Sequence, residues 1–208
     1  MSRTRIKVCG LRTAEDARAA AEAGADAVGF VFVESSPRVI TPDDAAEIMM
    51  RLPPLVTAVG VVQDLSVDEF ADLEERCPCP MMQLHGKESE KTVAACGPGV
   101  IKAIRYRPGF VQADFKRWDA VEEVDAVLID SPEPGSGQTI DWDEVAAAKA
   151  TLGKPLILAG GLNPDNAAEA VRKTRPYAVD VSSGVERERG AKDHRLIEQF
   201  CNAVASAG

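Results

Sequence analysis

Aromatic residues and basic charge are both scarce in this sequence. Phe, Trp and Tyr make up 5% of the 208 residues, so the core must depend on Val, Ile, Leu and Ala. The formal net charge of −9 argues against a nucleic-acid partner, because a phosphate backbone selects basic surfaces. We interpret the acidity as a contribution to solubility.

Long apolar runs and an export signal are also missing. No apolar stretch approaches the roughly 18 residues of a membrane-spanning helix. The N-terminal MSRTRIKVCG is basic, but no apolar segment follows it, so we do not expect it to be a signal peptide. We therefore expect a cytoplasmic protein that does not bind a membrane.

The cysteines do not form a metal-binding pattern. There are 5 of them, an odd number, which favours reduced thiols. Cys77 and Cys79 are separated by a single residue, unlike the cysteines of C-x-x-C, and the chain has only 2 histidines. We expect no metal site, and we interpret these two thiols as small side chains at a helix-to-strand junction.

What the sequence does contain is a regular alternation of short apolar runs with amphipathic stretches. Most runs are apolar throughout, which is typical of parallel strands covered by helices. The eight runs read RIKVCG, DAVGFVF, VTAVGVV, PMMQLHG, VIKAIRY, DAVLIDS, PLILAGG and AVDVSSG. Helix start signals lie between them, with predicted N-caps at Thr13, Thr41, Ser66, Asp141 and Asn163. The weakest helix signal extends from Phe110 to Glu122.

Eight strand–helix units predict an α/β protein, a small (β/α)₈ TIM barrel that forms a single domain over residues 1–208. A doubly wound sheet is the alternative. We disfavour it because no long crossover interrupts the alternation and no G-x-G-x-x-G follows the first run.

Small residues follow the last two runs, at the edge where such a barrel has its active site. Gly160-Gly161 follow the seventh run, and Ser183-Gly184 follow the eighth. Glycine lets the backbone approach an anion closely, and helix N-termini offer unpaired N–H groups. One such pair would be explained by ordinary turn chemistry. Two pairs, after the strands whose loops often bind phosphate in this fold, predict a phosphorylated ligand.

Side chains that can move protons or bind anions end other runs. Cys9 ends the first run and Asp130 the sixth. The fourth ends in Q-L-H-G, with His85, and Arg38 follows the second. Each residue also has a purely structural interpretation: Cys9 as a buried small side chain, Asp130 as a turn cap, and His85 and Arg38 as surface side chains. Considered one at a time, only His85 favours the structural interpretation. An acid and a base beside a phosphate suit a proton-transfer reaction without a cofactor.

The strand-end segments follow one another in a characteristic order: KVCGLR, SSPRVI, VGVV, QLHG, LIDS, DWDEV, LAGGLNPDN and VDVSSGVE. Together they resemble the phosphoribosylanthranilate isomerase family of tryptophan biosynthesis. The resemblance covers nearly the whole chain. KVCGL, QLHG and DVSSGVE are highly specific in combination, although each would be weak alone.

This resemblance implies a small barrel enzyme that needs no cofactor. Its reaction converts N-(5-phosphoribosyl)anthranilate to 1-(2-carboxyphenylamino)-1-deoxyribulose 5-phosphate by an Amadori rearrangement. The cysteine of K-V-C-G is the general base of the family, here Cys9, and the aspartate that ends strand six is the general acid, here Asp130. The arginine of the S-P-R stretch, here Arg38, holds the anthranilate carboxylate.

The resemblance also implies where the rest of the substrate binds. We expect the phosphate at Gly160, Gly161, Ser183 and Gly184, and further substrate contacts at Gln83, His85 and Asp180. The expected partner is a phosphorylated small molecule, and a homodimer is compatible with the sequence.

Two segments depart from the family pattern. The loop after strand six reads SPEPGSGQTIDW, where a G-G-T/S-G run and a Phe before Asp-Trp are expected. This departure leaves the contact of that loop with the aromatic ring of the substrate open. Strand three ends in VVQD, where Asn is common after the Val run.

Two other functions remain as alternatives. Another phosphosugar barrel, such as the sugar isomerase of the histidine pathway, normally uses two aspartates, whereas strand one here supplies Cys9. A phosphate-binding module or an inactive partner subunit would not require both Cys9 and Asp130. Turnover of phosphoribosylanthranilate separates these three functions.

Overall fold

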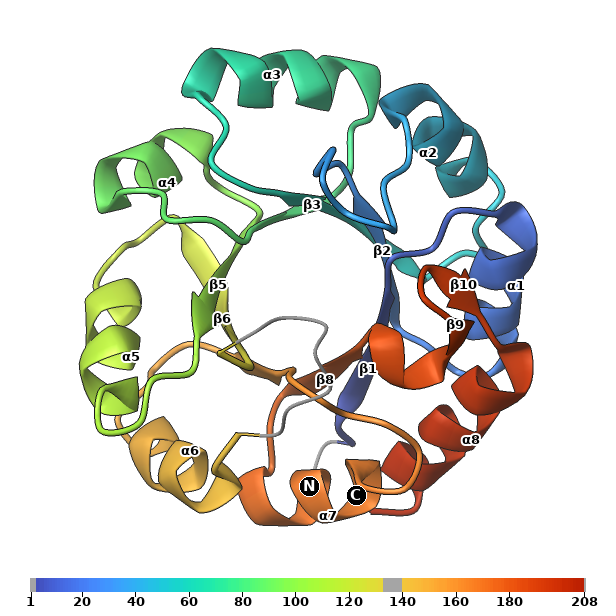
Figure 1. Ribbon diagram of the computed structural model, residues 1–208. Coiled ribbons are helices and arrows are strands. Elements are labelled where there is room, and N and C mark those ends of the chain that lie inside the picture. The colour runs from blue at the N-terminus through green and yellow to red at the C-terminus, as the bar shows by residue number, and fades with distance from the viewer. Residues whose placement is uncertain (1–2, 133–139, 208) are drawn as a thin grey trace.

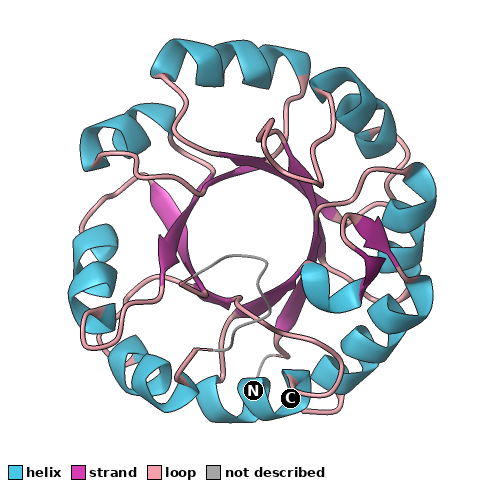
Figure 2. Ribbon diagram, viewed as in Figure 1, coloured by secondary structure: helices cyan, strands magenta, loops and turns pink. Residues whose placement is uncertain are grey.

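Parallel strands close into a barrel that is surrounded by a ring of helices (Figure 1, Figure 2). The computed structural model describes residues 3–132 and 140–207, and within these residues the closed barrel has eight strands, in chain order. Each strand pairs in parallel with the next, and the first strand closes the barrel by pairing with the eighth. The predicted (β/α)₈ fold is confirmed.

The barrel strands are β1 (Arg5–Cys9), β2 (Ala27–Val31), β3 (Thr57–Val62), β4 (Met81–Leu84), β5 (Val100–Arg105), β6 (Val124–Asp130), β7 (Leu156–Leu158) and β8 (Ala178–Val181). The helices are α1 (Ala14–Glu22), α2 (Pro42–Met49), α3 (Val67–Arg76), α4 (Glu90–Cys96), α5 (Val111–Asp119), α6 (Trp142–Lys149), α7 (Ala167–Thr174) and α8 (His194–Ala205). Each strand is short, so its last inward-facing residue lies close to the active-site end of the barrel.

Polar side chains begin four of the five helices for which the sequence predicts an N-cap residue. Thr13 accepts a hydrogen bond from the Asp16 amide, and Thr41 and Asp141 cap α2 and α6 in the same way. Ser66 forms a complete capping box with Glu69. These caps satisfy amides that have no partner inside the helix.

The predicted start of α7 is wrong by three residues. Asn166, not Asn163, occupies the N-cap position, and the helix begins at Ala167. Asn163 instead caps the turn before the helix, because its Oδ1 accepts from the amides of Asp165 and Asn166 at 2.9 and 3.2 Å. Pro164 therefore lies in that turn and not at the first helical position.

The strands alternate between two apolar environments. Ile6 and Val8 of β1 pack with the helices, whereas Lys7 and Cys9 face the interior of the barrel. Most of the interior is filled by small and medium apolar side chains: Val59, Ile101, Ala103, Ala126, Leu128, Ile157, Ala159 and Ala178. This packed layer forms the base on which the polar strand ends lie.

A small antiparallel hairpin follows the last barrel strand. The 3₁₀ helix η1 (Ser183–Val185) leads into β9 (Glu186–Glu188), which pairs with β10 (Ala191–Lys192) before α8 begins. The sequence did not predict this hairpin, because its strands are too short and too polar to show an apolar period. It lies beside the barrel mouth, where two of its side chains contact the site.

Cys77 and Cys79 lie between α3 and β4, at the helix-to-strand junction predicted for them. Both are buried, their sulfur atoms are 3.7 Å apart, and neither is in a disulfide. Among residues 3–132 and 140–207, no helix has the length and apolar character needed to cross a membrane.

Candidate active site

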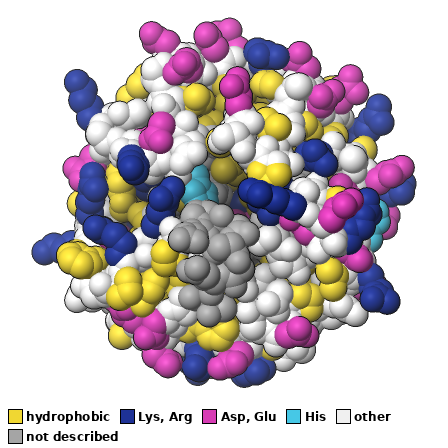
Figure 3. Space-filling view, viewed as in Figure 1, with side chains coloured by type: hydrophobic (Ala, Val, Ile, Leu, Met, Phe, Trp, Pro, Cys, Tyr) yellow, Lys and Arg dark blue, Asp and Glu magenta, His cyan; other side chains and the backbone are white. Residues whose placement is uncertain are grey.

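The carboxyl ends of the barrel strands surround a cavity of about 340 Å³. Cys9 of β1, Asp130 of β6 and Asp180 of β8 line it, together with Arg38 from the loop after β2. The predicted substrate contacts that also line it are Gln83, His85, Gly160, Gly161 and Ser183. Figure 3 shows Lys and Arg side chains on several sides of the centre of this face. Residues predicted from separate strands thus share one cavity.

The small residues after β7 and β8 have different structural tasks. Gly160 and Gly161 have φ values of 85° and 66°, the left-handed region that favours glycine. Gly184 does not line the cavity, and a Cβ on it would overlap the carbonyl oxygen of Leu162. Gly184 therefore lets the two loops pack against each other, and its phosphate contact stays a prediction.

Cys9 ends β1 with its thiol in the barrel interior. Gly29 lies opposite it in register on β2, and a Cβ on Gly29 would be only 2.7 Å from the Cys9 sulfur. Burial raises the pKa of the Cys9 thiol; the nearby charges of Lys7 and Lys192 lower it, and that of Asp180 raises it. The balance leaves the pKa above its ordinary value, so the resting thiol is protonated at neutral pH.

Lys7 and Asp180 form a buried ion pair one layer below Cys9. Lys7 Nζ is 3.0 Å from Asp180 Oδ1, and the two side chains are 3% and 9% exposed. Burial lowers the pKa of Lys7, but Asp180 and Cys9 raise it by more, so the amine stays protonated. Burial raises the pKa of Asp180, and Lys7 opposes that change. The short contact favours the ionised pair.

Asp130 is held at the end of β6 by its own neighbour. Its Oδ1 accepts a hydrogen bond of 2.7 Å from the Ser131 amide, while Oδ2 lies 3.3 Å from His85 Nε2. One carboxyl oxygen is therefore fixed by the backbone. The other oxygen faces His85, and Asp130 lines the cavity.

Gln83 and His85 extend from the end of β4 into the same cavity. The Gln83 side-chain nitrogen is 2.8 Å from His85 Nδ1, so Nδ1 accepts and Nε2 carries the proton of the neutral ring. Gln83 Oε1 is buried and has no hydrogen-bond partner among the described residues, whereas the nearest polar group to His85 Nε2 is the Asp130 carboxylate at 3.3 Å. Since buried polar atoms are normally paired, Gln83 Oε1 indicates a polar ligand in the cavity.

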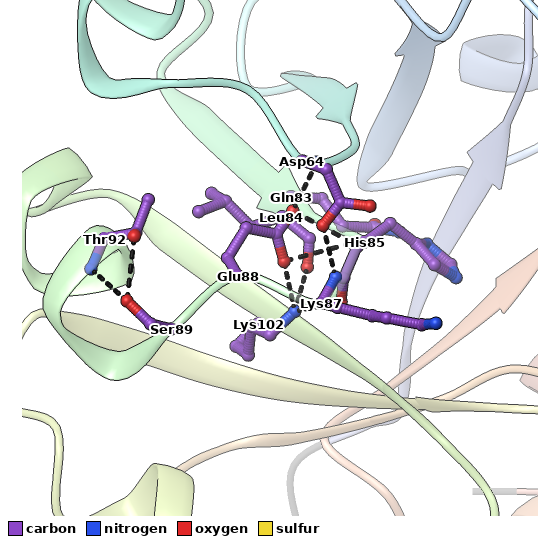
Figure 4. Close-up of polar contacts among 10 residues, drawn as sticks. Asp64, Gln83, Leu84, His85, Lys87, Glu88, Ser89, Thr92 and Lys102 are labelled. Atoms are coloured by element: carbon purple, nitrogen blue, oxygen red, sulfur yellow. Dashed lines mark hydrogen bonds and ion pairs between the residues drawn. The ribbon is translucent and has the colours of Figure 1, made fainter.

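A second buried ion pair fixes the loop that follows His85 (Figure 4). Glu88 Oε2 is 2.7 Å from Lys102 Nζ, and Glu88 Oε1 accepts from the amides of Asp64 and Gly86 at 3.0 and 2.9 Å. Lys102 Nζ also donates to the carbonyl oxygens of Leu84 and Gly86. The Q-L-H-G segment therefore has a rigid support outside the barrel.

Arg38 is oriented by the hairpin after β8. Its Nε and Nη2 donate to the two carboxylate oxygens of Glu186 at 2.6 and 2.9 Å. Lys192, whose side chain is fully buried, is 2.9 Å from Glu186 and also donates to the Ser182 carbonyl oxygen. Arg38 Nη1 has no partner within the described part of the chain, which leaves one edge of the guanidinium for a ligand carboxylate.

The two segments that depart from the family pattern have different outcomes. Residues 133–139 of the loop after β6 lie outside the described residues. Gln63, from the VVQD segment, lines the cavity. Gln63 therefore stands, with a longer side chain, at the position where Asn is common in the family.

Several charged side chains that support the site were missed by sequence reasoning, among them Lys7, Glu186 and Lys192. Glu186 and Lys192 come together only through the unpredicted hairpin, so no local pattern marks them. Lys7 did leave a signal: it is a lysine in an apolar strand, two residues before Cys9, and a period of two puts both side chains on one face. The same alternation identifies Asp180 on β8.

Comparisons with known proteins point to one enzyme family. The family model for N-(5'-phosphoribosyl)anthranilate (PRA) isomerase matches residues 6–203. An N-(5'-phosphoribosyl)anthranilate isomerase of Pseudomonas putida strain F1 is 43% identical over 212 residues, with 100% of both chains covered.

Solved structures of the same kind superimpose closely on this chain. The phosphoribosyl anthranilate isomerase of Thermus thermophilus has a TM-score of 0.89 and 36% identity, with 99% of this chain and 100% of that chain covered. A second such isomerase, in complex with reduced 1-(o-carboxyphenylamino)-1-deoxyribulose 5-phosphate, has a TM-score of 0.85 and 36% identity, covering 98% and 99%. The chain therefore belongs to the N-(5'-phosphoribosyl)anthranilate isomerase family and is an isomerase of tryptophan biosynthesis.

Proposed function

We propose that this cavity carries out an Amadori rearrangement of N-(5-phosphoribosyl)anthranilate, with Cys9 as general base and Asp130 as general acid. The observation that carries the proposal is that both residues line one cavity, together with Arg38 and the loops after β7 and β8. The substrate has one anionic group at each end, a carboxylate and a phosphate. Arg38 and the glycine-containing loops supply a site for each.

The phosphate is bound by the loops after β7 and β8. Gly160 and Gly161 line the cavity without side chains, and Ser183 at the start of η1 adds a hydroxyl. Backbone N–H groups at such a turn can donate to phosphate oxygens at close range. The homologous isomerase in complex with reduced 1-(o-carboxyphenylamino)-1-deoxyribulose 5-phosphate supports a phosphorylated ligand for this family.

The anthranilate carboxylate is bound by Arg38. Glu186 holds the guanidinium through Nε and Nη2, so the Nη1 edge faces the ligand in a fixed direction. A planar guanidinium suits a planar carboxylate because it can donate two parallel hydrogen bonds. This contact orients the aromatic amine with respect to Cys9 and Asp130.

Asp130 opens the ribose ring. A proton moves from Asp130 Oδ2 to the ring oxygen, the bond between that oxygen and C1 breaks, and the anthranilate nitrogen forms a C=N bond to C1. The amide of Ser131 keeps Oδ1 in place during this step. Asp130 is left as a carboxylate next to His85, whose Nε2 proton can stabilise the new charge.

Cys9 then removes the proton from C2. The electron pair of the C2–H bond forms the C1=C2 bond and neutralises the nitrogen, which gives an enolamine. The enolamine tautomerises to the ketone as C1 gains a proton and the C2 hydroxyl loses one. The whole sequence moves protons only, so it requires no cofactor. Because the resting thiol is protonated, a thiolate must be generated in the site before this step.

The experiment is a turnover assay with the purified protein. Phosphoribosylanthranilate is added, the loss of anthranilate fluorescence is followed, and the product is identified by mass and by its ketose chemistry. We expect catalytic conversion to the deoxyribulose phosphate. Binding without conversion would indicate a phosphate-ligand module, and turnover only of an imidazole-bearing phosphosugar would indicate the histidine-pathway type of isomerase.

A further inference from the structure

A lysine inside a TIM barrel is an unusual neighbour for a catalytic thiol. Lys7 is 2% exposed and lies on the interior face of β1, where most neighbouring interior positions hold Ala, Val, Ile or Leu. Removing two charges from water is costly, and a buried ion pair is often no more stable than apolar side chains of the same volume. The Lys7–Asp180 pair is therefore poorly explained by stability alone.

Lys7 is buried beside the cavity and is not among the residues that line it. Cys9 and Asp180 do line it, and Lys7 contacts Asp180. Asp180 Oδ1 holds Nζ at 3.0 Å, and strand register places Asp180 of β8 directly beside Lys7 of β1. The ammonium is therefore fixed against Asp180 in the barrel interior, at the level of the strand pair that precedes Cys9.

Lys7 and Cys9 share one face of a short strand, separated by one residue. The charge of Lys7 and its hydrogen bonding lower the pKa of the Cys9 thiol, against the larger effect of burial. In turn, Cys9 contributes to holding Lys7 in its protonated form. Each group thus favours the charged state of the other.

We propose that Lys7 is a positioning residue for Cys9: its buried ammonium, anchored by Asp180, stabilises the thiolate that removes the C2 proton. This inference rests on the proposed role of Cys9 as base. The proton that leaves the thiol goes to solvent or to the Asp130 carboxylate that ring opening has left. Lys7 keeps its own proton throughout. Lys7 thus acts on the rate through Cys9 and not through the substrate.

The other charges around Cys9 have weaker or opposite effects. Asp180 raises the pKa of the thiol, and Lys192 lowers it to a smaller extent than Lys7. Lys192 is also held by Glu186 and the Ser182 carbonyl oxygen, on the hairpin side of the cavity. Asp130 and His85 lie on β6 and at the end of β4, and both influence Asp180. Of the two lysines, Lys7 therefore stabilises the Cys9 thiolate more than Lys192 does.

The test measures the thiolate directly. The rate at which iodoacetamide alkylates Cys9 is followed against pH by peptide mass spectrometry, in the wild type and in Lys7→Met, with folding checked by circular dichroism. We expect the midpoint of the profile to rise by about one pH unit in Lys7→Met, which is tenfold less thiolate at a given pH below it. The kcat should fall by a similar factor, with KM unchanged.

Two control variants separate the effect of the Lys7 charge from the loss of any lysine. Lys154→Met removes a half-buried lysine that donates to the carbonyl oxygens of Val121 and Val124, away from the cavity, and should leave the midpoint in place. Lys7→Arg keeps the charge in a side chain of another shape and should keep the midpoint near that of the wild type.

An unchanged midpoint in Lys7→Met would overturn the proposal, and so would a rise of a full unit in Lys7→Arg. If Lys7→Met does not fold, the Lys7→Arg result decides alone. The alkylation profile does not depend on turnover, so it separates a failure of this inference from a failure of Cys9 as base, which a Cys9→Ser variant with full activity would show.

Discussion

Gly29 provides the space that the Cys9 thiol occupies. A Cβ on Gly29 would be 2.7 Å from the sulfur and 3.1 Å from the Cys9 Cα, so Gly29→Ala must displace the thiol. A displacement of a reacting group by about 1 Å costs on the order of 10²-fold in rate. We expect kcat of Gly29→Ala to fall by about that factor.

The matched control is Gly60→Ala on the adjacent strand. Its Cβ would be 2.5 Å from Met82 Sδ, a flexible side chain that does not line the cavity. Thermal unfolding and turnover are measured for both variants. Equal kcat values for Gly29→Ala and the wild type would show that the thiol position is not critical.

The acid and the base make a specific prediction for pH dependence. With Asp130 donating and Cys9 accepting, kcat of the wild type should follow a bell whose two apparent values belong to the coupled pair. Asp130→Asn preserves the shape of the side chain but removes the proton. The kcat of Asp130→Asn should be far below that of the wild type. It should also no longer decrease at high pH, where the wild-type kcat does. The remaining rate should rise toward high pH, because burial raises the pKa of the Cys9 thiol.

Asp125→Asn is the control, since Asp125 lies on the same strand but is exposed and caps the amides of Gly99 and Val100. The kcat of each variant is measured from acid to alkaline pH. A basic limb that persists in Asp130→Asn would assign the acid to another group, and His85 is the first candidate, because its Nε2 lies 3.3 Å from Asp130 Oδ2.

Individual residues could be predicted from the sequence only where a strand end or a motif marked them. Cys9 and Asp130 are the last residues of their strands, so topology alone brings them together. Glu186 could not be assigned a role in this way, because its contact with Arg38 joins residues 148 positions apart through a hairpin without an apolar pattern. Long-range polar pairs of this kind are determined by loop geometry.

Among the loops, the one after β4 depends on a buried charge. Burial raises the pKa of Glu88, but Lys102 and backbone amides lower it by more, so the carboxylate stays ionised. Glu88→Ala would leave Lys102 buried without its counter-ion, at a cost of about 3–5 kcal/mol. Glu90→Ala removes an exposed partner of Arg117 and should change stability by about 0–1 kcal/mol.

Urea unfolding of both variants against pH tests this prediction. A carboxyl group whose folded pKa is depressed contributes stability above its unfolded pKa of about 4.3, and that stability is lost as the pH falls through the folded value. The difference between Glu88→Ala and the wild type should therefore shrink in acid. Similar effects of Glu88→Ala and Glu90→Ala at pH 7 would mean that the buried pair does not support the loop.

The hairpin after β8 has its effect through Arg38. Glu186→Gln keeps the size of the side chain but removes the charge that holds Nε and Nη2 of Arg38. A hydrogen bond to a charged group contributes about 1.5–3 kcal/mol, so KM should rise about tenfold or more, with kcat largely preserved. Glu188→Gln, on the same strand but exposed, is the control.

Steady-state kinetics of the two variants with phosphoribosylanthranilate are compared. A kcat loss without a change of KM in Glu186→Gln would contradict the role assigned to Arg38 in binding the carboxylate.

The barrel as a whole was predictable because its signals repeat. Apolar runs, capping residues and short loops recur through the chain, and parallel strands that are buried on both faces leave few other arrangements. The start of α7 was misplaced because Asn163 and Asn166 both offer capping oxygens, and only the packing of the turn decides between them. The buried charges Lys7, Lys102 and Lys192 were not predicted, since composition assigns lysine to the surface.

The account of the whole molecule depends on one chemical step, the removal of the C2 proton by Cys9. The most direct test is kcat of Cys9→Ser in the anthranilate fluorescence assay, beside Cys96→Ser, which replaces a buried cysteine of α4 that does not line the cavity. A positioned base contributes about 10²–10⁴-fold to the rate, so the kcat of Cys9→Ser should fall by about that factor. The kcat of Cys96→Ser should stay at the wild-type value. A Cys9→Ser variant that turns over at the wild-type rate would contradict the account.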